Sequence, residues 1–368
     1  MTFWCVVTAG IAIAPNFQVA LVVRFLCGVA EGADIVVLPM MMNRVAPIGQ
    51  ESLWLGIFYV SNIVGVASGS SLGGFWEDNV TWTPFGFVPW QTAYIMNAIL
   101  MFPLILIAFF VYRTSDLKYL SSDNDDDQPR LTDPTADPKQ KPQPLLRGRN
   151  RIRHKLKGNR PPLMEGIKML LTNSLYVCIL LGPLISLLCT GAYSVYMITY
   201  VVQEYGISKF QAGSGIALIN MVAGGSGTFL GGIITDSLRS YKKIIHVKHE
   251  SIATALLVPV LVLALGCPIY TLSFFFDEIL FFWIFNTLAT LTYTAAPAPT
   301  MSAIMWHTEE FAGAMGISFY MVTTNVGMSI APPLLGFLLD KFPDNQQNVM
   351  MAFSSILYVS WLFRVIAW

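Results

Sequence analysis

The chain has 368 residues, of which 54% are hydrophobic and only 12% are charged. Its 22 basic and 22 acidic residues cancel to a formal net charge of zero. This composition excludes an ordinary soluble domain and predicts an integral membrane protein.

Apolar runs long enough to cross about 30 Å of hydrocarbon predict ten transmembrane helices in an all-α fold. Their length, their glycine and proline interruptions and the lack of strict alternation favour helices over strands. In chain order the runs lie near residues 1–14, 17–42, 52–76, 90–112, 174–201, 210–235, 251–273, 278–304, 312–339 and 349–367.

The second run contains an arginine and a glutamate seven residues apart. At 3.6 residues per turn, Glu31 returns to within about 20° of Arg24 on one helix face, with Gly28 between them. Charges inside a membrane helix are costly and mark sites for protons, ions or substrates. We therefore expect Arg24 and Glu31 to serve proton coupling or substrate binding. A static ion pair that fixes the helix is the alternative.

Two runs are rich in small residues at four-residue spacing, which lets helix backbones approach closely. Because the spacing recurs six runs later, it is typical of the same element in two duplicated halves. Ordinary helix packing is the alternative for each run alone. The residues are Gly65, Gly69, Gly73 and Gly74 in the third run, and Gly327, Pro332 and Gly336 in the ninth.

Basic residues collect in alternate connections, above all between the fourth and fifth runs. Such connections face the cytosol, so we expect both chain ends to be cytosolic. Asn79, in the sequence Asn79-Val80-Thr81, then lies on the opposite face and is a glycosylation candidate.

The connection after the fourth run is acidic, then proline-rich, then basic, which predicts a largely disordered linker. Its end, from Leu163 to Leu171, reads as a short amphipathic helix at the membrane interface. We therefore divide the chain into residues 1–112, the remainder of an N-terminal helical half, the cytosolic linker 113–173, and a C-terminal six-helix half at 174–368.

The sixth run ends in Gly232-Ile-Ile-Thr-Asp236-Ser-Leu-Arg239. Gly232 allows a neighbouring helix to come close, and Asp236 can pair with a cation or cap the N-terminus of another helix. We expect Asp236 and Arg239 to form a latch that holds one face of the protein closed and releases it on opening.

Other polar side chains inside the runs are candidates for lining a cavity, because such groups avoid lipid. Interhelical hydrogen bonding is the alternative role for most of them. The candidates are Tyr59, Asn62, Thr190, Tyr193, Tyr196, Asn286, Tyr293, Tyr320, Thr324 and Asn325. No catalytic, phosphate-binding or metal-binding constellation is evident, so we expect no enzymatic activity, cofactor or metal.

Three of these motifs resemble those of the major facilitator superfamily. Arg24-x-x-x-Gly28 resembles its fourth-helix motif, and residues 65–74 resemble its fifth-helix G-x-x-x-G-P-x-x-G-G motif, with Ser70 in place of proline. Residues 232–243 resemble the loop motif of its second half, although Ser237 stands where a basic residue is common.

The spacing Arg-x-x-x-Gly-x-x-Glu is similar to that of spinster-like transporters, from whose pattern Ala30 and Gly32 depart. The resemblance implies a twelve-helix fold of which about ten helices are present, with helices one and two missing, and therefore an N-terminally truncated chain.

The resemblance also implies alternating access, in which two halves rock about a central site. Glu31 would be the titrating carboxylate of a proton-coupled transporter, and Arg24 would hold an anionic headgroup. The implied substrate is a lysolipid- or sphingolipid-like amphiphile in a lysosomal, endomembrane or plasma membrane. A carrier of a small organic anion or other polar solute, and a non-transporting membrane scaffold, are the alternatives. We expect a monomer in the lipid bilayer, with no nucleic-acid partner.

Overall fold

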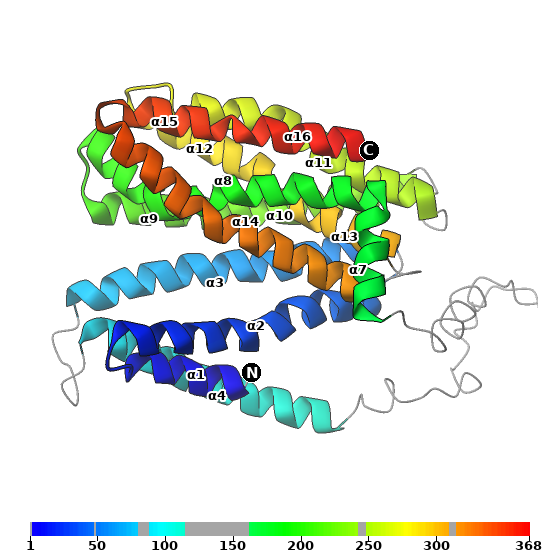
Figure 1. The fold of residues 1–368 in the computed structure, drawn as a ribbon, viewed down its shortest axis with the longest axis horizontal. Coiled ribbons are helices and arrows are strands. Elements are labelled where there is room, and N and C mark those ends of the chain that lie inside the picture. The colour runs from blue at the N-terminus through cyan, green and yellow to red at the C-terminus, as the bar shows by residue number, and fades with distance from the viewer. Residues whose placement is uncertain (1, 48, 80–87, 115–161, 242–247, 309–313) are drawn as a thin grey trace, which may run out of the picture. The chain divides into compact units, whose positions relative to one another are not determined.

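The computed structural model describes residues 2–47, 49–79, 88–114, 162–241, 248–308 and 314–368. Every regular element in these ranges is helical, as the apolar runs predict (Figure 1). The α-helices are α1 (Thr2–Ala12), α2 (Phe17–Val45), α3 (Glu51–Asn79), α4 (Pro89–Thr114), α7 (Leu163–Thr172), α8 (Ser174–Tyr205), α9 (Lys209–Ile219), α10 (Gly225–Tyr241), α11 (Lys248–Leu272), α12 (Ile279–Thr294), α13 (Pro297–Thr308), α14 (Ala314–Lys341), α15 (Gln346–Ser354) and α16 (Ile356–Ala367).

Eight stretches of these helices are long and apolar enough to span a membrane, and α1 is a shorter apolar helix. Together with α2 they account for the ten predicted runs, which confirms an all-α, multi-pass membrane fold. The short helix expected at the end of the linker is α7, which buries Gly166 and Leu170 and exposes Leu163 and Met164. The linker residues 115–161 lie outside the described ranges.

Three predicted runs contain breaks that the apolar pattern does not show. A π-helical turn, η2 (Asn220–Gly224), separates α9 from α10, and a second break separates α12 from α13 at Ala295 and Ala296. The latter precedes Pro297, whose missing N–H cannot continue the helical ladder. The last run is interrupted at Ser355, between α15 and α16. Such local breaks change neither the length nor the mean hydropathy of a run, so the apolar pattern could not predict them.

Contacts divide the chain into two compact units. Unit 1 comprises the described residues of 1–34 and 79–160, and unit 2 those of 35–78 and 161–368. Within unit 1, α1 packs along α4; within unit 2, α8 packs against both α14 and α16. Unit 2 therefore contains α3, although the sequence assigns this helix to the N-terminal half.

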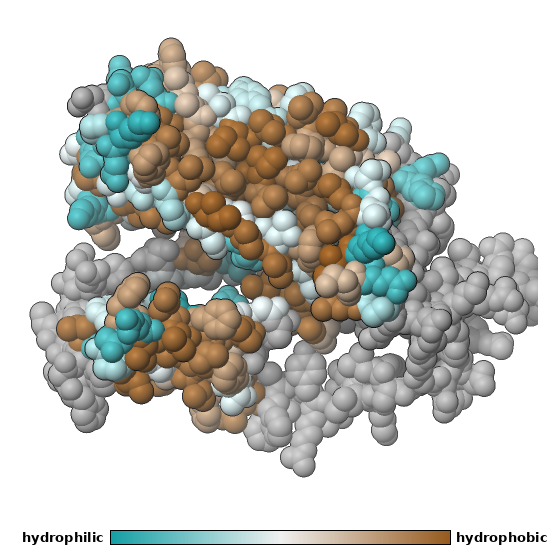
Figure 2. Space-filling model, in the orientation of Figure 1, coloured by the Kyte–Doolittle hydropathy of each residue, from teal (hydrophilic) through white to brown (hydrophobic). Residues whose placement is uncertain are grey.

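Unit 2 has two hydrophobic core clusters. One is rich in aromatic residues and includes Tyr193, Tyr200 and Phe274. The other includes Leu55 of α3 together with Met301 of α13, so α3 shares a core with the C-terminal helices. Figure 2 shows hydrophobic side chains over the sides of the C-terminal helices, with hydrophilic groups gathered toward their ends, as a bilayer requires.

Candidate functional site between α3, α10 and α13

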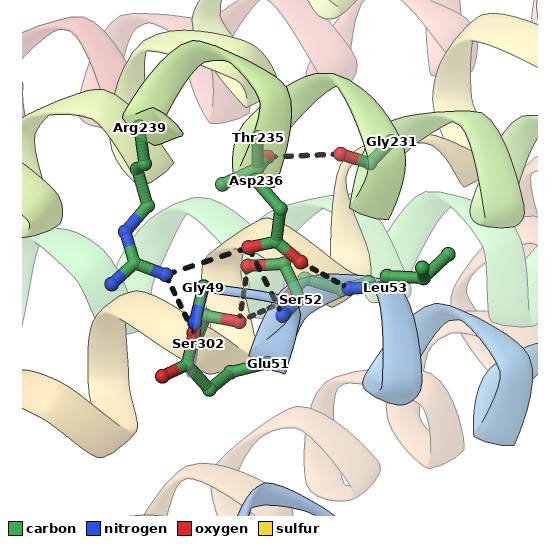
Figure 3. Close-up of polar contacts among 10 residues, drawn as sticks. Gly49, Glu51, Ser52, Leu53, Gly231, Thr235, Asp236, Arg239 and Ser302 are labelled. Carbon is green, nitrogen blue, oxygen red and sulfur yellow. Dashed lines mark hydrogen bonds and ion pairs between the residues drawn. The ribbon is translucent and has the colours of Figure 1, made fainter. Parts of the chain in front are cut away.

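Asp236 lies near the end of α10 and is only 5% exposed. Its carboxylate accepts hydrogen bonds from the backbone N–H groups of Ser52 at 3.3 Å and Leu53 at 2.7 Å (Figure 3). Both donors belong to the first turn of α3, where N–H groups have no partner within the helix. Asp236 thus caps α3 at the positive end of its dipole, one of the roles the sequence predicts for it.

Arg239 lies one turn further along α10 and is buried between two carboxylates. Its Nη1 donates to Glu51 Oε2 at 2.8 Å and to Asp236 Oδ1 at 3.4 Å. Its guanidinium carbon lies 4.0 Å from the centre of the Trp306 ring on α13. Glu51 also accepts the N–H of Gly49 at 3.1 Å. The three charged side chains form one buried network that joins α3, α10 and α13.

Small residues allow these helices to approach each other. A Cβ atom on Gly232 of α10 would lie 2.5 Å from the carbonyl oxygen of Ser52 and 2.9 Å from Leu53 Cα. A Cβ on Gly56 of α3 would lie 3.0 Å from the carbonyl oxygen of Thr228. The hydroxyls of Ser52 and Ser302 are 3.0 Å apart, which adds a direct bond between α3 and α13. We call Glu51, Ser52, Asp236, Arg239 and Ser302 the latch.

Glu51, Ser52, Ser302 and Trp306 are site residues that the sequence analysis missed. A carboxylate in the first turn of a helix is so common that Glu51 carries no special signal. One signal could have indicated these residues: a buried Asp236–Arg239 pair requires hydrogen-bond donors and acceptors from another helix.

Arg24, Gly28 and Glu31 lie on α2, within unit 1. Arg24 is exposed, and its guanidinium carbon lies 4.9 Å from the centre of the Tyr94 ring on α4. Glu31 is also exposed, and the two charged side chains do not pair with each other among the described contacts. A Cβ on Gly28 would meet no atom within 4 Å. The static-pair alternative therefore finds no support.

The structure brings part of the predicted cavity set together. Thr190 of α8 donates a hydrogen bond to the Tyr293 hydroxyl at 2.7 Å. Tyr320 of α14 is 6% exposed and lies in the core cluster against which Tyr59 of α3 packs. These four residues, on α3, α8, α12 and α14, form a polar cluster inside unit 2.

Other members of that set are placed differently. Tyr193 lies in the aromatic core and donates to the carbonyl of Met350 at 2.7 Å, which argues against a lining role, because its hydroxyl is already used for packing. Thr324 donates to the carbonyl of Tyr320 within its own helix. Asn286 is buried, Tyr196 packs against Gly336, and Asn62 and Asn325 are exposed.

The glycine-rich stretches of α3 and α14 differ in their surroundings. A Cβ on Gly327 would lie 2.9 Å from the carbonyl oxygen of Leu184, so α14 approaches α8 closely there, beside Pro332 in the same helix. In contrast, a Cβ on Gly65 or Gly69 would have no neighbour within 4 Å. Within unit 2, therefore, no close helix contact is present at these two glycines.

Three further candidates lie at the far end of α3. Gly73 and Gly74 belong to the helix, and Asn79 is its last residue. Their side-chain surroundings, and the remainder of the glycosylation sequon, are outside the described residues.

A hollow of about 450 Å³ opens between α9 and α12. Its lining contains no residue of the predicted cavity set, so it does not coincide with the polar cluster. The lining residues are Ile207, Gln211, Ser214, Gly215, Leu218, Ile279 and Trp283.

A sequence profile described as "Major Facilitator Superfamily" matches residues 1–305. Among curated proteins, the chain is 26% identical over 237 residues to "Probable sphingolipid transporter spinster homolog 2" of Arabidopsis thaliana, a match that covers 64% of this chain and 43% of that protein. It is 27% identical over 138 residues to homolog 1 of the same plant, covering 38% of this chain and 26% of that protein. The chain thus spans less than half the length of the curated relatives it matches.

Solved structures share the fold at low identity. The E. coli fucose:proton symporter FucP is 14% identical, with a TM-score of 0.64, over 100% of this chain and 81% of that chain. A bacterial homolog of the human lysosomal transporter Spinster, in an inward-facing and occupied conformation, is 14% identical, with a TM-score of 0.56, over 100% of this chain and 80% of that chain.

Proposed function

Because the chain belongs to the major facilitator superfamily, we propose that it is a secondary active transporter that works by alternating access. The latch is the observation that carries this proposal. Alternating access needs a contact that closes one face of the cavity and can be released. A small network of buried charges at helix ends suits this purpose. Its ion pairs are strong while water is excluded, and water solvates the charged groups when the helices separate.

The substrate we propose is a lysolipid- or sphingolipid-like amphiphile. Support comes from the curated relatives, whose names describe probable sphingolipid transporters, and from the shared fold of the bacterial Spinster homolog. The alternatives are a carrier of small organic anions and a non-transporting scaffold. Transport assays distinguish between these three functions. We further propose a monomer in a lysosomal, endomembrane or plasma membrane.

Proton coupling is the second part of the proposal, and we assign it to Glu31. This residue and Arg24 place two charges inside an otherwise apolar stretch of α2. An intramembrane carboxylate that can bind and release a proton is a recurring element of coupled transporters. Arg24 lies over Tyr94, so its position is held by packing rather than by Glu31.

Replacing Glu31 with glutamine is expected to abolish accumulation of substrate driven by a pH gradient, because the amide cannot exchange a proton. Exchange of labelled for unlabelled substrate should persist, since it needs no net proton movement. The measurement is uptake of a radiolabelled lysolipid into proteoliposomes with and without a pH gradient. Glu204→Gln, at an exposed position of α8, is the matched control.

Gradient-driven uptake that survives Glu31→Gln would contradict the coupling role. If the wild-type chain transports small organic anions but no lysolipid, the substrate is a small organic anion and the proposed lipid substrate is wrong. A chain that moves neither would favour the scaffold.

A further inference from the structure

A second arginine, which is not part of the latch, lies buried in unit 2. Arg364 of α16 is 6% exposed. Its Nη1 donates to the hydroxyl of Thr300 on α13 at 2.9 Å, and its Nη2 donates to the hydroxyl of Ser186 on α8 at 3.4 Å. Its Nε has no hydrogen-bond partner. No described carboxylate pairs with it, whereas Arg239 has two.

This arrangement is costly, because a guanidinium stays charged in proteins and its charge has been removed from water. Two neutral hydroxyls supply no compensating negative charge. Arginines inside membrane bundles almost always face a partner or a pathway. A buried charge without a carboxylate partner among the described residues is therefore suited to a ligand that brings the negative charge with it.

The surrounding helices are shaped to hold this side chain. A Cβ atom on Gly182 of α8 would lie 2.8 Å from Arg364 Cγ, so the glycine leaves space for the arginine stem. Ser360, one turn earlier on α16, donates to the carbonyl of Gly182 at 2.6 Å and also bonds the Ser186 hydroxyl. The position of the guanidinium is thus set from α8 and α16 together.

The charge adjoins the polar cluster of unit 2. Ser186, which accepts from Arg364, lies one turn before Thr190 on α8, and the Thr190 hydroxyl donates to the carbonyl of Ser186 at 3.1 Å and to the Tyr293 hydroxyl at 2.7 Å. Tyr320 belongs to the core cluster that contains Ala298 and Met301 of α13, close in sequence to Thr300, and Tyr59 of α3 packs against the same cluster. Hydroxyl groups from α8 and α13 therefore bind a cation that has no carboxylate partner among the described residues, and further hydroxyls lie on the neighbouring helices, a combination that suits an oxyanion.

We propose that Arg364 is an anion subsite that binds the phosphate or carboxylate of an anionic amphiphile, with Tyr293 and Tyr320 as additional hydrogen-bond donors. The planar guanidinium matches either oxyanion with two parallel bonds. The proposal rests on the proposed transport function. It adds that the substrate is anionic and that Arg364, in the C-terminal half, binds its charged group. The hydrophobic remainder of the ligand contributes no charge and is indifferent to Arg364.

Binding measurements test this subsite without requiring transport. The purified full chain in lipid nanodiscs is titrated with 1-oleoyl lysophosphatidate, and binding is followed by intrinsic tryptophan fluorescence. Uncharged mono-oleoylglycerol has the same acyl chain and serves as the neutral probe, and inorganic phosphate serves as the headgroup without a chain. Arg364→Met is expected to weaken lysophosphatidate binding by about 30-fold or more, the usual result of deleting one partner of a buried charge pair, and to leave mono-oleoylglycerol binding unchanged.

Two further variants separate ligand binding from a structural role. Arg364→Lys keeps the charge without the planar fork and should recover only part of the affinity. Lys341→Met removes an exposed cation at the end of α14 and should change nothing. If Arg364 is a ligand site, Arg364→Met should keep or raise the melting temperature, because an apolar side chain replaces an uncompensated charge.

Three results would overturn the assignment: equal losses for the charged and neutral probes, unchanged affinity for lysophosphatidate, or a lowered melting temperature without a selective loss. Arg364-dependent binding of inorganic phosphate as tight as that of the lysolipid would support the oxyanion site and identify free phosphate as its source. If selective binding is present but no substrate is transported, the transport function fails while the subsite stands. If transport proceeds and binding ignores Arg364→Met, only the subsite fails.

Discussion

Replacing Asp236 with asparagine is expected to weaken the closed contact between α3 and α10 by about 3 kcal/mol, the cost of removing one partner from a buried charge network. Asparagine has nearly the same shape, so the change removes the charge that caps the first turn of α3 and leaves Arg239 with Glu51 alone. A shift of this size changes the ratio of closed to open molecules by about 150-fold.

The Ser52 and Ser302 hydroxyls, 3.0 Å apart, provide a direct measurement of this closure. Cysteines introduced at both positions should form a disulfide rapidly under mild oxidation, detected by mass spectrometry of the linked peptides. Adding Asp236→Asn should slow the linkage strongly, and Asp340→Asn, at an exposed position of α14, should not.

The same double-cysteine protein should lose transport when oxidised and regain it on reduction, because the latch must open in each cycle. Transport that continues with the two positions linked would show that α3 and α13 do not separate, and the latch would then be a static contact. An unchanged linkage rate in Asp236→Asn would show that the charge does not hold the helices together.

Replacing Gly191 with alanine is expected to destabilise unit 2 by about 1 to 3 kcal/mol, the usual cost of forcing an extra group into a packed contact. A Cβ at this position of α8 would overlap the carbonyl oxygen of Met328 and lie 2.8 Å from its Cα. These are backbone atoms of α14, so a change of side-chain rotamer cannot relieve the clash. The two helices must separate instead, along the contact that also includes Gly327 and Gly336.

The melting temperature of the purified protein in detergent measures this effect. Gly213→Ala on α9 is the matched control, because its Cβ would meet only Ile198 Cδ1 at 3.8 Å, an ordinary contact. The control should be neutral or slightly stabilising, since alanine favours helix more than glycine does. Equal melting temperatures for the two variants would mean that α8 and α14 yield easily at this point.

Sequence patterns predicted the helices and about half of the latch residues. Asp236, Arg239 and Gly232 could be singled out because a glycine, an acid and a base at the end of an apolar run suggest a helix that meets another one closely. Their partners could not, because Ser52 and Leu53 contribute backbone N–H groups, which every residue except proline has. Glu51 lies 188 positions before Arg239, and no local spacing relates them.

Arg364 was missed for a related reason. A single arginine near the end of an apolar run reads as an anchor at the membrane surface. Only the packing of α16 against α8 and α11 buries it, and its hydroxyl partners lie on α8 and α13. Conversely, Gly65 and Gly69 carry the spacing of a helix contact, but within unit 2 no atom lies within 4 Å of a Cβ at either position. Small residues permit close approach without requiring it.

The sequence by itself determined that this protein is an all-α membrane protein with ten apolar runs, because the length and polarity of a segment decide whether it can cross a bilayer regardless of its neighbours. It also indicated that charges at α2 and at the end of α10 require compensation. Only the tertiary structure decided which groups supply it. Asp236 and Arg239 are paired with groups of α3, whereas Arg364 binds only hydroxyl groups. The difference arises because pairing depends on which helices approach within hydrogen-bond distance.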